Sequence, residues 1–286
     1  MQGIREYNKK ITSLKNTRKI TSSMKMISSV KLQRFSKMRQ NAAPFWQTAQ
    51  TALDSICSIA GDTSVLCNGY PQSRKAMVLL FSSDRGLCGR FNTNAIRKAL
   101  QLLEELTSDG KRECIFCFAG TKGHAFFKRQ KLPVESVYEG VSIPDYSTSS
   151  GIADDLLNKY TNGDVQEVWI VYTRKAGLVE EPFAERLLPF EYNRNVTSGA
   201  QNALLEESSI ELLNSYARIA VRAKIYKAHM ESTVSEHNAR MSAMETATTN
   251  CDQMIQRYIK LRNRARQTAI TTELSEIVSG KEAIDN

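Results

Sequence analysis

The feature that most restricts the fold is the distribution of glycine and proline. No glycine or proline occurs between Gly199 and Gly280, and Pro44 is the only one between Gly3 and Gly61. The other prolines and most of the glycines lie in the stretch between these two segments. Because glycine and proline interrupt helices, this distribution predicts a long helix at each end and a different kind of structure between them.

The two end segments carry apolar residues at helical spacing. In the C-terminal segment the spacings of three and four residues are those of a coiled coil. This pattern consists of Ala220, Ala223, Met230, Val234, His237, Met241, Met244, Thr248, Cys251, Ile255 and Tyr258. A looser N-terminal stripe, which drifts in register, consists of Ile4, Tyr7, Ile11, Leu14, Ile20, Met24, Ile27, Leu32, Phe35 and Met38. Neither stripe is wide enough for a globular core, so we expect the two helices to pair in an antiparallel coiled coil.

The central region alternates strand-like and helix-like patterns. Buried strands are predicted over 75–83, 113–120 and 165–177, helices over 92–106, 121–130 and 147–163, and an edge strand broken by its prolines over 181–190. Strands separated by single helices predict a Rossmann-like α/β domain with a largely parallel sheet. The expected α/β chain therefore has an N-terminal coiled-coil helix over 1–60, a central domain over 70–195 and a C-terminal coiled-coil helix over 205–286.

The net charge of +9 is concentrated at the N-terminus. Residues 1–40 contain eleven basic residues and one acidic residue, whereas residues 200–286 contain eleven of each. This excess predicts an anionic partner for the N-terminal segment. Nucleic acid, an anionic lipid surface and an acidic protein surface all satisfy that prediction.

The six cysteines lie mostly in apolar patterns and are expected to be reduced core thiols. Cys114 and Cys117 form a CxxC motif, but the surrounding ECIFCFAG is typical of a buried strand, so neither a metal nor a redox role is favoured. No apolar run is long enough to predict a membrane span. The N-terminus lacks the apolar core of a secretory signal.

The stretch SSDRGLCGRFN, residues 82–92, is the best candidate for a chemical site. Gly86 and Gly89 follow a predicted strand and precede a predicted helix, which is where α/β domains hold phosphates. The stretch lacks the GxGxxG and P-loop patterns, and Arg85 and Arg90 could equally bind protein carboxylates. A structural or docking turn is therefore favoured over nucleotide binding.

The remaining residues match no catalytic template. His124, His229 and His237 lack the spacing of a zinc-protease motif, and no GxSxG sequence occurs. His237 is expected to pack in the coiled-coil seam, and Asp154 and Asp155 to lie on a solvated helix face. We therefore expect a mechanical or binding protein that is not itself an enzyme and uses no cofactor or metal.

Three stretches closely resemble the gamma subunit of F-type rotary ATP synthases. They are NTRKITSSMKMISSVKL (16–32), SSDRGLCGRFN (82–92) and YIKLRNRARQTAITTELSEIVSG (258–280). The resemblance covers essentially the whole chain, in the family's order and spacing. It implies a coiled-coil rotor shaft, an α/β foot, and a non-catalytic role in coupling proton flow through the c-subunit ring to ATP synthesis or hydrolysis on the beta subunits.

The resemblance also implies specific contacts. Met24 and Lys25 match positions that face an acidic loop of the beta subunit, and Arg266 and Gln267 match positions that contact a second beta loop. The resemblance also places Thr268, Thr271 and Glu273 near the second contact, with weaker support. In the foot, a partner contact or a structural turn is expected for Arg85, Gly86 and Gly89.

The implied partners are the alpha and beta subunits, the epsilon subunit and the c-subunit ring, with no nucleic acid and with membrane contact only through the complex. The implied location is peripheral, on the cytoplasmic face of a bacterial inner membrane, with an organellar inner membrane or a thylakoid as the alternative. A different function stays open from charge alone, namely a basic coiled-coil protein that binds nucleic acid or an anionic membrane. Against a basic zipper, residues 41–199 separate the basic segment from the C-terminal heptads.

Overall fold

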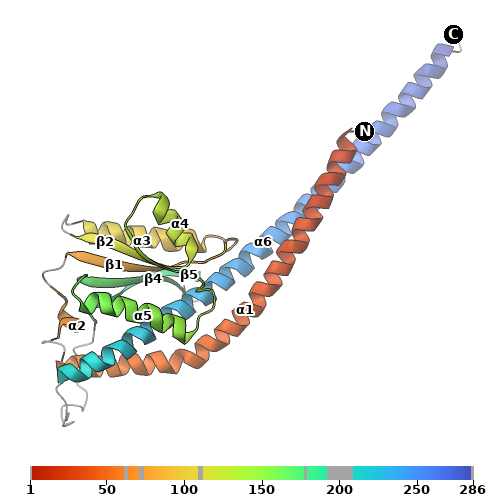
Figure 1. Ribbon diagram of the computed structural model, residues 1–286. Helices are drawn as coiled ribbons and strands as arrows, with labels where there is room; N and C mark the ends of the chain where they lie inside the picture. The colour runs from red at the N-terminus through yellow and green to blue at the C-terminus, as the bar shows by residue number, and fades with distance from the viewer. Residues whose placement is uncertain are drawn as a thin grey trace. The chain divides into compact units, whose positions relative to one another are not determined.

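The computed structural model describes residues 2–60, 64–70, 74–108, 112–176, 179–191 and 209–284 (Figure 1). They fall into two compact units, which we treat separately. The helix-pair unit comprises the described residues before 30 and after 239, and the sheet unit comprises those from 30 to 239. Two long helices, α1 (Gln2–Ala60) and α6 (Ser209–Ile284), contribute residues to both units.

The sheet unit contains a five-stranded mixed sheet in the order β3-β2-β1-β4-β5. Its strands are β1 (Lys75–Phe81), β2 (Glu113–Ala119), β3 (Val134–Tyr138), β4 (Glu167–Ala176) and β5 (Val179–Leu188). Its further helices are α2 (Val65–Asn68), α3 (Phe91–Thr107), α4 (Thr121–Arg129) and α5 (Tyr146–Thr161). Neighbouring strands are parallel except β4 and β5, which are antiparallel, so the predicted largely parallel α/β sheet is confirmed.

Both faces of the sheet are covered, because side chains along β1 alternate between two apolar cores. Met77, Leu79 and Phe81 belong to a core shared with α5 and with residues of α1 and α6. Val78 and Leu80 belong to a second core, shared with α3 and α4. Figure 1 shows α3 and α4 on the opposite side of the strands from α5.

Two details of the central region differ from the sequence prediction. The short elements β3 and α2 were not predicted. One of the two breaks predicted in the last strand was wrong, because β5 runs through Pro182, which pairs with Thr173 of β4. The strand does end at Leu188, directly before Pro189. Since β5 is an edge strand with a ladder partner on one side only, it can accommodate a residue that lacks an N–H.

The helix α1 also continues through a proline. Pro44 lies inside α1, where a missing N–H and a steric clash cost about 3 kcal/mol. Further along the helix, Ala49, Leu53 and Cys57 are almost fully buried in the sheet unit. We infer that this burial offsets the local cost of the proline.

In each unit, α1 and α6 pack antiparallel, as predicted. In the helix-pair unit the rings of Tyr7 and Tyr258 lie 6.1 Å apart. In the sheet unit Phe35 stacks on the buried His237 at 5.4 Å, and Tyr216 Oη donates to the carbonyl of Ala49. Within the sheet unit the α6 residue number falls as the α1 number rises, which defines the antiparallel direction.

Candidate functional site

The seam between the two helices of the helix-pair unit turns polar in its middle. Ile11 of α1 is buried, as are Cys251 and Ile255 of α6. Further along α1, Arg18 Nε lies 2.5 Å from Asp252 Oδ1. Arg18 occupies the next seam position of α1, but its ion pair with Asp252 is half exposed and lies at the rim of the seam.

Two more polar layers follow the ion pair. Thr21 Oγ1 and Thr248 Oγ1 are 2.8 Å apart, and Lys25 Nζ donates to Glu245 Oε1 at 2.7 Å. Ser28, the next seam position of α1, is only 2 % exposed. Thr21 and Ser28 therefore place hydroxyl groups in the seam, whereas the Lys25–Glu245 pair is partly solvated and lies at its rim. A solvated ion pair of this kind contributes about 0–1 kcal/mol.

This register overturns part of the predicted N-terminal stripe. Ile20 and Ile27 were expected in the seam, but they are 61 % and 57 % exposed, and neighbouring Met26 is 70 % exposed. The regular three-four spacing of Ile4 to Leu14 does not drift but continues through polar positions. The seam of α1 therefore follows the unbroken spacing of three and four residues and not the apolar residues alone.

The residues predicted to contact the beta subunit lie at two separate levels of the helix-pair unit. Met24 is partly buried, and Lys25 is paired with Glu245, whereas Arg266 and Gln267 are exposed. Glu245 and Arg266 are 21 residues apart on α6. This separation corresponds to about 32 Å along the helix axis, at about 1.5 Å per residue. The structure therefore does not bring the two predicted contacts together.

Five basic residues of α6 lie between Arg257 and Arg266, and antiparallel pairing predicts that the basic N-terminal face lies beside them. The structure shows this for part of that face. Lys10 Nζ lies 5.6 Å from the ring centroid of Tyr258, which is inside the C-terminal cluster. Lys25, by contrast, lies beside Glu245, well before the cluster begins. Only the first turns of α1 therefore share that level.

The side chains near the C-terminal end of α6 are exposed. Side chains from Thr271 to Ser279 are exposed, including Glu273. The large apolar side chains in this part of α6, counting Ile270 just before that stretch, are Ile270 (46 % exposed), Leu274 (58 %), Ile277 (68 %) and Val278 (58 %). The hydroxyls of Thr268 and Thr271 donate to helix carbonyls one turn earlier, so their methyl groups add to this surface. An apolar helix end of this kind is typical of an interaction surface.

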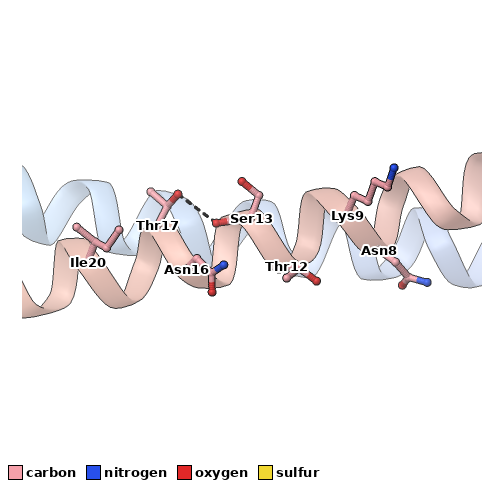
Figure 2. A pocket seen from close by; sticks show the side chains of 7 residues that line it. All are labelled: Asn8, Lys9, Thr12, Ser13, Asn16, Thr17 and Ile20. Atoms are coloured by element: carbon pink, nitrogen blue, oxygen red, sulfur yellow. Dashed lines mark hydrogen bonds between the residues drawn. The ribbon is translucent and has the colours of Figure 1, made fainter.

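Two surface grooves accompany these features. One, of about 570 Å³, runs along α1 alone, and Figure 2 shows its lining of mostly amide and hydroxyl side chains. Its residues are Asn8, Lys9, Thr12, Ser13, Asn16, Thr17 and Ile20. A second groove, of about 380 Å³, lies between Tyr7 and the stretch of α6 around Ala265. Both offer polar and apolar contact to a partner rather than an enclosed reaction chamber.

In the sheet unit the predicted chemical loop occupies the position expected of a ligand site. The strand order reverses between β1 and β4, and ligands of open α/β sheets bind beyond the carboxyl ends of the strands at this point. Residues 82–90 connect β1 to α3 there.

The polar groups of this loop are, however, bonded to the start of α4. Asp84 Oδ1 accepts from Thr121 N at 3.1 Å, and Ser82 Oγ accepts from Gly123 N at 2.9 Å. Gly120 approaches so closely that a Cβ there would lie 2.0 Å from the carbonyl oxygen of Ser82. Within the loop, Ser83 N donates to Asn92 Oδ1 at 3.0 Å. Because these polar groups are bonded inside the protein, the geometry favours a structural turn over nucleotide binding.

The three named residues of the loop lie at its surface. Arg85, Gly86 and Gly89 are exposed, and Gly89 has a φ of 57°. Leu87 is also left-handed, with a φ of 64°, and its side chain is 60 % exposed. Leu87 was not among the site residues predicted from the sequence. Nothing in the loop sequence indicates that a leucine there adopts this uncommon backbone conformation.

The acidic pair of α5 was expected on a solvated face and is partly exposed, but both carboxylates also have partners inside the protein. Asp154 accepts two hydrogen bonds from the Arg222 guanidinium, which lower the pKa of its carboxyl group. Asp155 accepts a hydrogen bond from Tyr138 and lies 3.4 Å from Lys159 Nζ. Both carboxylates tie α5 to neighbouring elements.

His229 is a structural histidine of the sheet unit. It is 1 % exposed, and its Nε2 donates to the Val141 carbonyl at 2.6 Å while Nδ1 lies 3.0 Å from Ser149 Oγ. Burial lowers the pKa of its ring. It therefore joins α6 to α5 and to the segment before α5.

Several N-terminal cations already have carboxylate partners inside the protein. Besides the Arg18 and Lys25 pairs, Lys10 pairs with Glu6 at 2.7 Å, and Arg39 of the sheet unit pairs with Glu231 at 2.9 Å. Part of the basic excess is therefore used for internal packing, which leaves less charge for nucleic acid or lipid.

Across the described part of the chain, no cluster of three or more histidine, cysteine, aspartate or glutamate side chains could hold a metal ion. No helix in that part has the length and apolarity needed to cross a membrane. The features that remain as candidates for function are the surface of the helix pair and the loop after β1.

Comparisons with known proteins match the whole chain. A family model described as ATP synthase matches residues 3–284. The ATP synthase gamma chain of Clavibacter sepedonicus is 32% identical, covering 98% of this chain and 97% of that relative. The gamma chain of Anaeromyxobacter sp. (strain Fw109-5) is 35% identical, covering 99% of this chain and 100% of that relative.

Solved structures share the fold at lower identity. A chain of the Euglena gracilis mitochondrial ATP synthase matches with a TM-score of 0.70 at 18% identity, covering 98% of this chain and 94% of its own length. A chain of the central stalk and c-ring of the Tetrahymena thermophila mitochondrial enzyme matches with a TM-score of 0.57 at 21% identity, covering 80% and 99%. Because the family model and the curated relatives match from end to end, the chain belongs to the ATP synthase gamma-chain family.

Proposed function

We propose that this chain is the central rotor stalk of an F-type ATP synthase. Proton flow through a ring of c subunits turns it, and its turning drives ATP synthesis at sites on the beta subunits, or runs in reverse during hydrolysis. Beside family membership, one observation carries the proposal. The helix-pair unit leaves Ile20, Ile27 and the apolar tip of α6 exposed, and such a surface requires a surrounding partner.

The division of labour follows the predicted parts. Residues 1–60 and 205–286 form the shaft, enclosed at its tip by alpha and beta subunits, and residues 70–195 form the foot. The foot contacts the epsilon subunit and the c-subunit ring. The chain itself supplies no catalytic group, and it reaches the membrane only through the complex, on the cytoplasmic face in a bacterium.

The proposed contacts with the beta subunit differ in how available they are. Arg266 and Gln267 are exposed and can meet a partner loop directly. Lys25 is held by Glu245, so an acidic loop has to share or displace that carboxylate, and Met24 offers a partly buried thioether beside it. In the foot, Arg85, Gly86 and Gly89 form a turn whose exposed side can also contact a partner.

Reconstitution tests the main proposal. The purified chain is mixed with matched alpha and beta subunits, and ATP hydrolysis is measured with and without it. We expect assembly and ATP hydrolysis to require the chain, and we expect no hydrolysis by the chain alone. Turnover by the isolated chain, or an alpha-beta assembly of equal activity without it, would contradict the proposal.

The contact residues are tested in the same complex. Arg266→Ala with Gln267→Ala should lower the ATPase rate by about two- to five-fold, because each solvated contact contributes about 0–1 kcal/mol. Arg257→Ala removes an exposed cation from the same helix and serves as the matched control. An equal loss in both variants would argue against a specific contact at Arg266 and Gln267.

A further inference from the structure

Two cysteines far from any sequence motif are in contact within the sheet unit. Cys57 lies near the end of α1 and Cys67 lies on α2, and their Sγ atoms are 3.4 Å apart. Neither takes part in a disulfide. Since a disulfide S–S bond is about 2.05 Å long, the two sulfurs have to approach by about 1.4 Å to bond.

The CxxC motif, by contrast, cannot close. Cys114 packs in the core under α3 and α4, whereas Cys117 packs in the core under α5. Residues three apart on a strand point to opposite faces, so the sheet itself separates these two thiols. The pair that looks redox-active in the sequence is therefore inert as a pair, and a pair ten residues apart is the one in contact.

We propose that Cys57 and Cys67 form a site of reversible oxidation, at which a low-molecular-weight disulfide such as oxidised glutathione converts them to an intramolecular disulfide. The Cys67 thiolate attacks one glutathione sulfur, forms a mixed disulfide and releases one glutathione thiolate. The Cys57 thiolate then attacks the Cys67 sulfur and displaces the second. The protein loses two electrons and two protons, and oxidised glutathione gains both electrons and becomes two thiols.

The surroundings of the two thiols set the order of these steps. Cys57 is 1 % exposed, whereas Cys67 is partly exposed and so meets the oxidant first. The side-chain interaction with Cys67 and burial both raise the pKa of the Cys57 thiol, which makes Cys57 the less reactive thiol in the first step. Once Cys67 carries glutathione, the Cys57 sulfur is already in contact with the sulfur that it has to attack, which favours ring closure in the second step.

The disulfide would fasten α1 to a short element that already holds the sheet unit together. In α2, the carbonyl of Val65 accepts from Tyr160 Oη at 2.7 Å, and that of Leu66 accepts from Phe190 N at 2.7 Å. A bond from α1 to α2 therefore also ties α1 to α5 and to the residues after β5. We expect the oxidised sheet unit to resist unfolding more strongly than the reduced one.

Peptide mapping of the full chain tests the proposal, because trypsin leaves Cys57 and Cys67 together in residues 40–74 and Cys114 and Cys117 together in residues 113–122. The folded chain is incubated with excess oxidised glutathione, blocked, digested and weighed. We expect the 40–74 peptide of the oxidised chain to carry no blocking group and to be lighter by two hydrogen atoms than the unblocked reduced peptide. Dithiothreitol should restore both thiols. The 113–122 peptide should keep both thiols.

Variants separate the disulfide from general oxidation. Oxidation should raise the thermal midpoint of the native chain and of the control Cys114→Ser by about 5 °C or more. The same treatment should leave the midpoint of Cys67→Ser unchanged, with no loss of hydrogen from its 40–74 peptide. The proposal is overturned if the wild-type 40–74 peptide keeps both thiols, or if glutathione stays attached to Cys67 without ring closure.

Discussion

The two units of this chain bury different kinds of side chain. The sheet unit encloses large aromatic residues such as Phe116, Tyr160 and Tyr172, all less than 2 % exposed. The helix pair instead buries Thr21 and Ser28 in its seam and has two half-exposed ion pairs beside it, while large apolar residues lie on its outside. The sheet unit is therefore stabilised by its own apolar core, whereas the helix pair leaves apolar surface exposed for a partner.

This difference has an energetic consequence. Burying an apolar side chain contributes about 1.5–3 kcal/mol, whereas a solvated ion pair contributes about 0–1 kcal/mol. Most of the chain's own stability should therefore reside in the sheet unit.

We expect the strongest effect of a substitution in the aromatic core of the sheet unit. Phe116 is fully buried, with its ring centroid 4.6 Å from that of Phe127. Phe116→Ala should lower the free energy of unfolding by about 3–5 kcal/mol, because it leaves a cavity between the sheet and its helices. Urea unfolding followed by tryptophan fluorescence measures the loss, since Trp46 and Trp169 both lie in the sheet unit. A loss below about 1 kcal/mol would contradict a sheet unit that is stabilised by its own core.

The next effect is a pH dependence carried by His229. The pKa of its ring in the folded chain lies below the ordinary value of 6.5 because burial disfavours the charged form. As pH falls below 6.5, the unfolded chain binds a proton that the folded chain does not, so stability falls, by at most about 1.4 kcal/mol per pH unit. The nearby carboxylates Asp84 and Asp145 oppose this shift.

The variant His229→Gln isolates this contribution. It should be less stable than the wild type at pH 7.5, because it disturbs buried hydrogen bonds, but its stability should change less between pH 6.5 and 5. Urea unfolding of both proteins over this range gives the difference in slope. Parallel curves would show that His229 is not the titrating group.

A smaller effect is expected at the loop after β1, where two glycines can be compared directly. Gly89 has a φ of 57°, so Gly89→Ala should cost about 1 kcal/mol of stability. A Cβ added at Gly86 would have no heavy atom within 4 Å, so Gly86→Ala should change stability by less than about 0.5 kcal/mol. Equal effects in thermal unfolding would mean that the loop is not held in its observed turn.

The smallest effect is expected in the helix pair. A double-mutant cycle with Lys25→Ala and Glu245→Ala should give a coupling energy below about 1 kcal/mol that weakens with salt. The matched cycle in the sheet unit, Arg222→Ala with Asp154→Ala, should give the larger value because that pair is bidentate. A stronger coupling at Lys25 would contradict a seam of weak contacts.

The sequence predicts the fold well where periodicity is strong. The seam from Ala220 to Tyr258 is buried or partly buried at each predicted position, and the strands with continuous apolar runs occur as predicted. The elements that were missed, β3 and α2, contain five and four residues, too few to establish a period.

The site was harder to predict, because it depends on contacts between distant segments. A polar seam at Thr21 can be recognised only when its partner Thr248 is known. For the same reason nothing in the sequence pairs Cys57 with Cys67 or shows that Cys114 and Cys117 lie on opposite faces. The contact residues Met24, Lys25, Arg266 and Gln267 rest on resemblance to the family and remain predictions.

Observation of rotation in single complexes tests whether this chain is a rotor. The chain, assembled with alpha and beta subunits fixed to a surface, carries a bead on an exposed residue of the sheet unit such as Arg97. We predict stepwise rotation of the bead in one direction when ATP is supplied, and its arrest when ATP is removed. A complex that hydrolyses ATP at full rate while a firmly attached bead stays still would contradict a rotor role for this chain.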